Sequence, residues 1–176
     1  AAPNVIPNFA EVFYYVRHPE PEQVRAIFDR VAAAAEGAAM GTGTSVDFEV
    51  IHGIYNILPN VTLQERMHAN LQTVGGVEYT AEERRFAEMI RSSLGDDAPP
   101  VDEAAVVQPF QREWEGGGGS TDVGDVSWAV PTVDLSTATW VPGTAAHSWQ
   151  AVAAGGGTIG DKGMVVAANT MALTLV

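Results

Sequence analysis

Residues 119–150 restrict the fold of this chain more than any other stretch, because they hold two short apolar runs separated by a turn. The runs are Val126 to Val130 and Thr137 to Val141, with Pro131 between them. Short apolar runs bounded by turn residues predict buried strands. A polar loop precedes the first run, and a single histidine, His147, follows the second. Because α/β enzymes present site residues on such loops, the stretch predicts an α/β fold.

The first 58 residues predict a strand–helix–strand unit. Residues 9–16 (FAEVFYYV) are aromatic and β-branched, which predicts a strand covered on both faces. Pro21 and the acids beside it favour a helix start, and apolar residues at helical spacing continue to about Glu36, with Gly37 as the predicted C-cap. Residues 44–52 alternate apolar and polar side chains, which predicts a half-exposed strand.

The sequence becomes more helical after a composition break at residues 56–60. Capping-box patterns predict helix starts at Thr62 (with Glu65) and at Thr80 (with Glu83). Residues 95–119 predict a long loop. Residues 161–175 are almost uniformly apolar, which predicts a final helix buried against a sheet.

The composition excludes several classes of function. The formal net charge of −13 argues against nucleic acid and anionic membranes as partners, and no apolar run is long enough to span a membrane. The absence of cysteine excludes disulfides and thiolate metal sites. We therefore expect a soluble, cytoplasmic protein.

Several separated motifs in this chain resemble one enzyme family. They are Ala2 to Pro7, STDVGDVSW at 120–128, Gly143-Thr144 followed by HSWQ at 147–150, and IGDKGMVVAANTMALT at 159–174. In this order they are similar to the metal-dependent amidohydrolases of the aminoacylase and carboxypeptidase G type, and most to the branch that acts on p-aminobenzoyl-glutamate.

The resemblance implies a zinc-peptidase-like α/β catalytic domain interrupted by an α+β, ferredoxin-like lid that dimerises. Residues 1–58 resemble the second half of the lid, and residues 59–176 the C-terminal part of the catalytic domain. The first halves of both domains are absent, so the chain resembles a C-terminal fragment.

His147 matches the family's last metal-ligand histidine, whereas the residues alone allow a histidine packed beside Trp149. Neutral imidazole binds Zn²⁺ or Mn²⁺ well. The family's complete site holds two such ions, but one histidine cannot hold a metal alone. The other ligands and the general-base glutamate belong to the absent half, so we expect no catalytic residue here. His18, His52 and His68 have no metal-ligand spacing.

Asn4 and Arg17 resemble the pair that the family's lid uses on the substrate carboxylate. A guanidinium can hold a carboxylate through two parallel hydrogen bonds. From the residues alone, the pair could equally be a turn residue and a solvated strand end.

Ser120, Thr121 and Asp122 resemble the family's substrate loop, although such residues also form ordinary turns that bind their own backbone. Thr121 favours the p-aminobenzoyl-glutamate branch, because close relatives outside it often carry Ser-Glu-Asp here. Gly143, which the resemblance also places among the substrate-binding residues, is expected to shape the turn that presents His147. Lys162 is interpreted as a capping or packing residue of the last helix.

Two functions of different class follow. The first is a metal-dependent amidohydrolase that cleaves the amide of an N-acyl or aroyl amino acid such as p-aminobenzoyl-glutamate, working as a homodimer or with its missing N-terminal half. The alternative is an inactive truncated relative that acts as a binding or self-association module, since exposed strand edges favour pairing with another chain.

Overall fold

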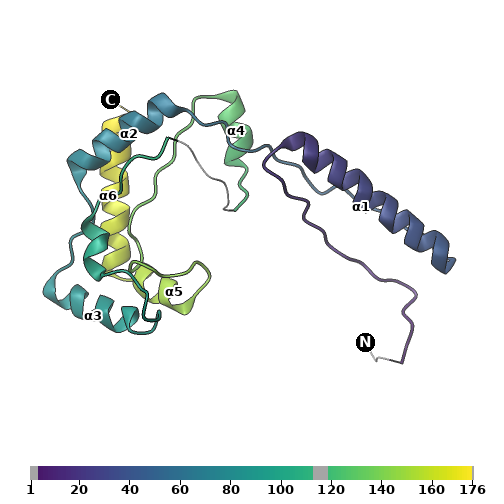
Figure 1. The fold of residues 1–176 in the computed structure, drawn as a ribbon, viewed down its shortest axis with the longest axis horizontal. Coiled ribbons are helices and arrows are strands. Elements are labelled where there is room, and N and C mark those ends of the chain that lie inside the picture. Colours follow the sequence, from purple (N-terminus) through teal and green to yellow (C-terminus); the bar gives the residue numbers. More distant parts are fainter. Residues whose placement is uncertain (1–3, 113–118, 176) are drawn as a thin grey trace. The chain divides into compact units, whose positions relative to one another are not determined.

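The computed structural model describes residues 4–112 and 119–175 as helices joined by extended segments (Figure 1). The helices are α1 (Pro21–Thr42), α2 (Val61–Val74), α3 (Ala81–Arg91), η1 (a 3₁₀ helix, Val101–Ala105), α4 (Val123–Ala129), α5 (Trp149–Gly155) and α6 (Thr158–Thr174). The described residues fall into two units. The first contains residues 4–57 and 119–126, and the second contains residues 58–112 and 127–175.

The predicted α/β fold is not confirmed, because the described residues contain no β-strand. Most of the first apolar run, residues 126–129, lies in helix α4. Residues 9–16 and 44–52 are extended but belong to no sheet. Residues 137–139 are bent, with the Thr139 N–H donating to the Thr137 carbonyl at 2.9 Å. An extended segment becomes a strand only when a neighbour accepts and donates its backbone hydrogen bonds. None of the described segments supplies that neighbour, so Phe9 and Tyr14 remain 77% and 71% exposed.

Helix α1 of the first unit continues beyond the predicted end at Gly37. Ala38, Ala39 and Met40 are good helix formers, so the helix tolerates Gly37 and ends at Gly43, which takes the left-handed conformation with φ 67°. The helix has no buried residue. Its Phe28 ring meets the Phe48 ring edge-on, with 6.0 Å between centroids.

Helices α2 and α6 lie side by side in the second unit, and α5 contacts α6 (Figure 1). The buried core consists of Ala87, Ile90, Val101, Val141, Ala154 and Ile159, with Tyr79 and Phe86 packed against it. Two of these residues come from regions where the sequence predicted a loop or a strand. Val101 lies in η1, inside the predicted long loop, and Val141 ends the second apolar run.

The two predicted capping boxes had different outcomes. The Thr80 and Glu83 box is confirmed, because each side chain accepts a hydrogen bond from the other residue's backbone N–H. The Thr62 box is wrong. Asn60 caps α2 instead by accepting from the Leu63 N–H at 3.1 Å, while Glu65 pairs with Arg112.

Helix α6 is buried on one face only, so the prediction of a wholly buried helix is wrong for the described residues. Ile159, Gly160, Gly163 and Thr170 are buried, whereas Met164 and Val165 are 61% and 53% exposed. Because no sheet forms among the described residues, the apolar residues outside the α2 and α5 contacts stay uncovered.

The contact between α5 and α6 depends on glycine at position 160. A Cβ built there would lie 2.2 Å from the Gly155 carbonyl oxygen, whereas one at Gly37 in α1 meets nothing within 4 Å. We expect Gly160→Ala to destabilise α6 by about 1–3 kcal/mol through overpacking. Gly37→Ala should stabilise α1 by up to about 1 kcal/mol, because alanine is the better helix former. Amide hydrogen exchange in α1 and α6 measures both effects, and equal protection of α6 in the wild type and Gly160→Ala would contradict the first.

Candidate functional site

His147 has the most unusual backbone of the described residues. It is the one described residue other than glycine with positive φ, at 60°. This left-handed conformation costs an L-residue about 1–2 kcal/mol. The residue is exposed, and its imidazole makes no hydrogen bond or ion pair with any residue in the described part of the chain. Neither ring nitrogen is hydrogen-bonded within that part of the chain.

The loop before His147 is anchored in the core. Val141 is 1% exposed, and its carbonyl accepts a hydrogen bond from the Thr144 N–H at 3.1 Å. Between them Gly143 adopts φ 86°, and a Cβ there would lie 2.7 Å from Cδ of Pro99. The turn thus requires glycine at 143, both for its conformation and for space.

Ser148 joins this loop to helix α5. Its hydroxyl donates to the Ala145 carbonyl at 2.7 Å and accepts from the Ala151 N–H at 3.2 Å. Ala151 and Ala154 are buried, which fixes α5 on the second unit. The Gln150 amide also donates to Ser93 Oγ at 3.3 Å. Ser148 was not among the residues predicted from the sequence, although a serine three residues before a helical N–H is a recognisable N-cap signal.

A groove of about 890 Å³ lies beside this loop in the second unit. Trp140, Val141, Gly143 and Thr144 line it together with the extended residues 106–108. Its wall is mostly apolar, yet Thr144 Oγ1 is buried and lacks a hydrogen-bond partner among the described residues. An unsatisfied buried hydroxyl is costly to the fold.

The polar loop before α4 largely binds itself. The Thr121 hydroxyl accepts from the Val123 N–H at 3.3 Å and lies 3.4 Å from Asp122 Oδ1, to which it donates. Ser120, Thr121 and Asp122 are all exposed. Asp125 has a different task, since its Oδ1 accepts from the Tyr55 N–H at 2.8 Å. Asp125 is the one of these four residues shown to bond to a residue distant in sequence, and this bond holds the backbone at Tyr55.

Asn4 and Arg17 are exposed in the first unit, where the Arg17 guanidinium lies over the Tyr15 ring, 5.3 Å from its centroid. Ser120, Thr121 and Asp122 belong to that unit as well, whereas Gly143 and His147 belong to the second. Of the predicted substrate residues, Gly143 is thus described in the same unit as the predicted metal ligand and the others in the first unit, and the role of each stays a prediction.

Residues 4–112 and 119–175 contain no group of three or more His, Asp or Glu side chains able to hold a metal ion. His147 is predicted to be a metal ligand, but one histidine cannot retain a metal by itself. Two of the other histidines have contacts with other residues: His18 Nδ1 accepts from the Glu20 N–H at 3.0 Å, and the His68 ring lies 5.5 Å from that of Phe110. Across the same described ranges, no helix combines the length and apolarity required to span a membrane.

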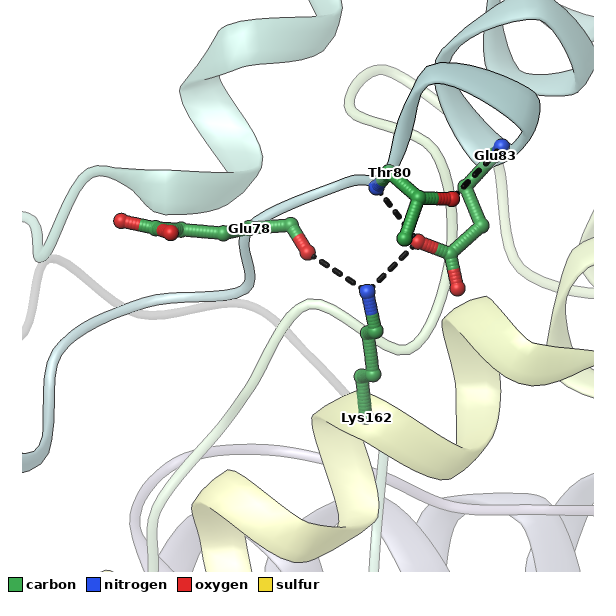
Figure 2. Close-up of polar contacts among 4 residues, drawn as sticks. All are labelled: Glu78, Thr80, Glu83 and Lys162. Carbon is green, nitrogen blue, oxygen red and sulfur yellow. Dashed lines mark hydrogen bonds and ion pairs between the residues drawn. The ribbon is translucent and has the colours of Figure 1, made fainter.

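A cluster of polar side chains that includes Thr80, Glu83 and Lys162 joins α3 to α6 (Figure 2). Lys162 Nζ lies 2.6 Å from Glu83 Oε2 and donates to the Glu78 carbonyl at 2.9 Å, which confirms its packing role. Hydrogen bonds from Lys162, from the Thr80 N–H and from Thr158 lower the pKa of Glu83 to about 2. Burial, with the neighbouring Glu83 charge, raises the pKa of Tyr79 to about 12. Glu83 therefore stays ionised at neutral pH and acts as a structural anion.

The chain is similar in sequence to three curated hydrolases. It is 36% identical to the B subunit of p-aminobenzoyl-glutamate hydrolase of Escherichia coli (strain K12) over 198 aligned positions, which cover 99% of this chain and 41% of that protein. It is 30% and 26% identical to the Xaa-Arg dipeptidases of Mus musculus and Homo sapiens, over 74% of this chain and 24% of each relative.

The chain thus spans less than half the length of the curated relatives that it matches. No protein-family model matches it, and no solved structure matches it.

Proposed function

The chain belongs to the hydrolase family that contains p-aminobenzoyl-glutamate hydrolase and the Xaa-Arg dipeptidases, and we propose from this membership that it forms part of a metal-dependent amidohydrolase. Its substrate would be an N-acyl or aroyl amino acid such as p-aminobenzoyl-glutamate. The observation that carries the proposal is the 36% identity along almost the whole chain, in which an exposed histidine sits on a backbone of positive φ.

His147 would supply one ligand of a zinc or manganese centre. The metal would polarise the scissile carbonyl and lower the pKa of a bound water. The alignment covers 41% of the bacterial relative. The remaining ligands and the general-base glutamate would come from the part of the enzyme that corresponds to the rest of that relative's length.

Asn4 and Arg17 would bind the carboxylate of the substrate. Both side chains are exposed, and a guanidinium matches the geometry of a carboxylate. Ser120, Thr121 and Asp122 would line the substrate loop, and Gly143 would shape the pocket wall beside the metal ligand.

The α/β architecture belongs to the complete enzyme in this proposal. Residues 9–16 and 44–52 would pair as strands of half a lid formed by residues 1–58, and residues 59–176 would complete the catalytic domain. Their exposed apolar side chains, such as Phe13 at 69% and Phe48 at 55%, support a partner that covers them. The bacterial relative is by name one subunit of a hydrolase, which supports assembly with another chain, and the enzyme would work in the cytoplasm.

The alternative is a binding or self-association module without turnover. It is supported by the same exposed apolar residues.

One assay separates the two functions. The chain, checked by intact mass against 18.6 kDa, is tested for zinc and manganese content and for hydrolysis of p-aminobenzoyl-glutamate. The same measurements are made after mixing it with a polypeptide covering the rest of the bacterial relative's length. The hydrolase proposal expects no metal or turnover from the chain alone and both from the mixture. A mixture that forms a stable complex but binds no metal and cleaves nothing would favour the binding module.

A further inference from the structure

We propose that Ser148 is a positioning residue that holds His147 in its left-handed conformation and so aims its imidazole. The inference rests on the proposed function for its consequence, metal binding, but its structural part concerns only the second unit. It follows from the two hydrogen bonds of one hydroxyl that span the histidine.

One of the two bonds closes a small ring of backbone around His147, and the other caps the helix that follows it. The Ser148 hydroxyl donates to the Ala145 carbonyl, two residues before the histidine, at 2.7 Å. The same oxygen accepts from the Ala151 N–H, four residues after the histidine, at 3.2 Å. The hydroxyl therefore ties the loop that ends at His147 to the first turn of α5.

The chain on both sides of this ring is fixed in the core of the second unit. Ala151 is 7% exposed and Val141 is 1% exposed, and the Thr144 N–H bonds to Val141 on the loop side. The chain must pass from the Val141 turn to α5 within a few residues. With the Ala145 carbonyl held by Ser148, the reversal is made at His147, which takes φ 60°.

The histidine side chain is exposed and makes no hydrogen bond within the described part of the chain, so hydrogen bonds of its own do not hold this arrangement. A left-handed L-residue persists only where its surroundings impose that conformation. The neighbouring Ser148 is the residue whose side chain contacts both sides of position 147. Its donor function is thus separate from ordinary helix capping, which needs only an acceptor.

Substitutions at 148 can separate the two functions of the hydroxyl. Ser148→Asp keeps the acceptor, and aspartate is an excellent N-cap, but an ionised carboxylate cannot donate to the Ala145 carbonyl. Ser148→Thr keeps both functions, and Ser148→Ala removes both. The chain has a mass of 18.6 kDa, which suits NMR spectroscopy of the intact protein.

The first measurement is the nuclear Overhauser effect between the amide proton and the Hα of His147, which is strong when φ is positive. We expect a strong effect in the wild type and Ser148→Thr, and a weak one in Ser148→Asp and Ser148→Ala. The amide protons of α5 should be as well protected from exchange in Ser148→Asp as in the wild type. That result would show that the cap and the fold survive. A strong effect in Ser148→Asp would overturn the proposal.

The second measurement is zinc affinity of the complex reconstituted with the remaining polypeptide, with zinc alone as the probe. Loss of a hydrogen-bonding group that orients a metal ligand, without touching the metal itself, typically lowers metal affinity about 10–100-fold. We expect a loss of about tenfold or more in Ser148→Asp and recovery in Ser148→Thr. If His147→Ala lowers zinc affinity but Ser148→Asp does not, the positioning role is overturned. If His147→Ala itself leaves zinc affinity unchanged, the proposed function fails. The Overhauser effect alone then tests whether Ser148 holds the backbone of His147.

Discussion

Replacing His147 by glycine is expected to abolish hydrolysis and metal binding in the reconstituted enzyme while leaving the fold at least as stable as the alanine variant. Loss of one of about three protein ligands removes a catalytic metal site. The backbone effect is favourable, because φ of 60° costs an L-residue about 1–2 kcal/mol and costs glycine almost nothing. Function and stability should therefore change in opposite directions at this one position.

Three variants test this expectation: His147→Gly, His147→Ala and a change at a histidine of similar exposure. His147→Gly should be more stable than His147→Ala by about 1 kcal/mol, since alanine keeps the left-handed strain. His52→Ala is the matched control, because His52 is also exposed and shares no metal-ligand group among the described residues. Metal content by elemental analysis and turnover of p-aminobenzoyl-glutamate are measured in each. Full activity in His147→Gly would disprove the ligand assignment.

Lys162→Met is expected to destabilise the second unit by about 2 kcal/mol, because it leaves the Glu83 carboxylate without its cation. Glu83 is only 8% exposed, so solvent cannot fully replace the lost partner. Methionine keeps an apolar stem of similar length, which limits the loss of packing. Arg84→Met is the control: Arg84 pairs with Asp102, but both side chains are exposed, at 47% and 67%, so its effect should be smaller. Urea denaturation measures both, and equal losses would contradict the importance of burial.

The same ion pair predicts how stability depends on pH. The pKa of Glu83 falls from 4.5 to about 2 in the folded chain, mainly through Lys162 and the Thr80 N–H. A lowered folded pKa contributes stability that is complete above pH 4.5 and is lost as the pH falls toward 2. Lys162→Met removes the largest cause, so we expect a shallower loss of stability across this interval than in the wild type. Urea midpoints measured across the interval test this, and parallel curves for the two proteins would contradict it.

The sequence by itself determined the features that local chemistry controls. The capping box of Thr80 and Glu83 forms as predicted, because its bonds link residues three apart. Helix α1 begins at Pro21 because proline fits the first turn. The motifs also predicted the family, since the relation to the bacterial hydrolase extends along 99% of the chain.

Tertiary structure decided what depends on distant neighbours. The segment 9–16 has the composition of a strand, but strand pairing needs backbone partners that the described residues lack. The same reason left one face of α6 exposed although its composition predicted burial. Val101 joined the core through contacts with residues far along the sequence, which no local pattern in residues 95–119 reveals.

The site illustrates the same division. The motif identified His147, but its φ of 60° results from a loop held by Val141 on one side and by α5 on the other. Ser148 is one residue away in sequence, yet its importance follows from a hydroxyl that reaches both sides of the histidine. The sequence alone identifies the residue type at position 147. The backbone conformation of that exposed residue depends on the packed elements on either side of it, because their packing offsets the strain of a left-handed residue.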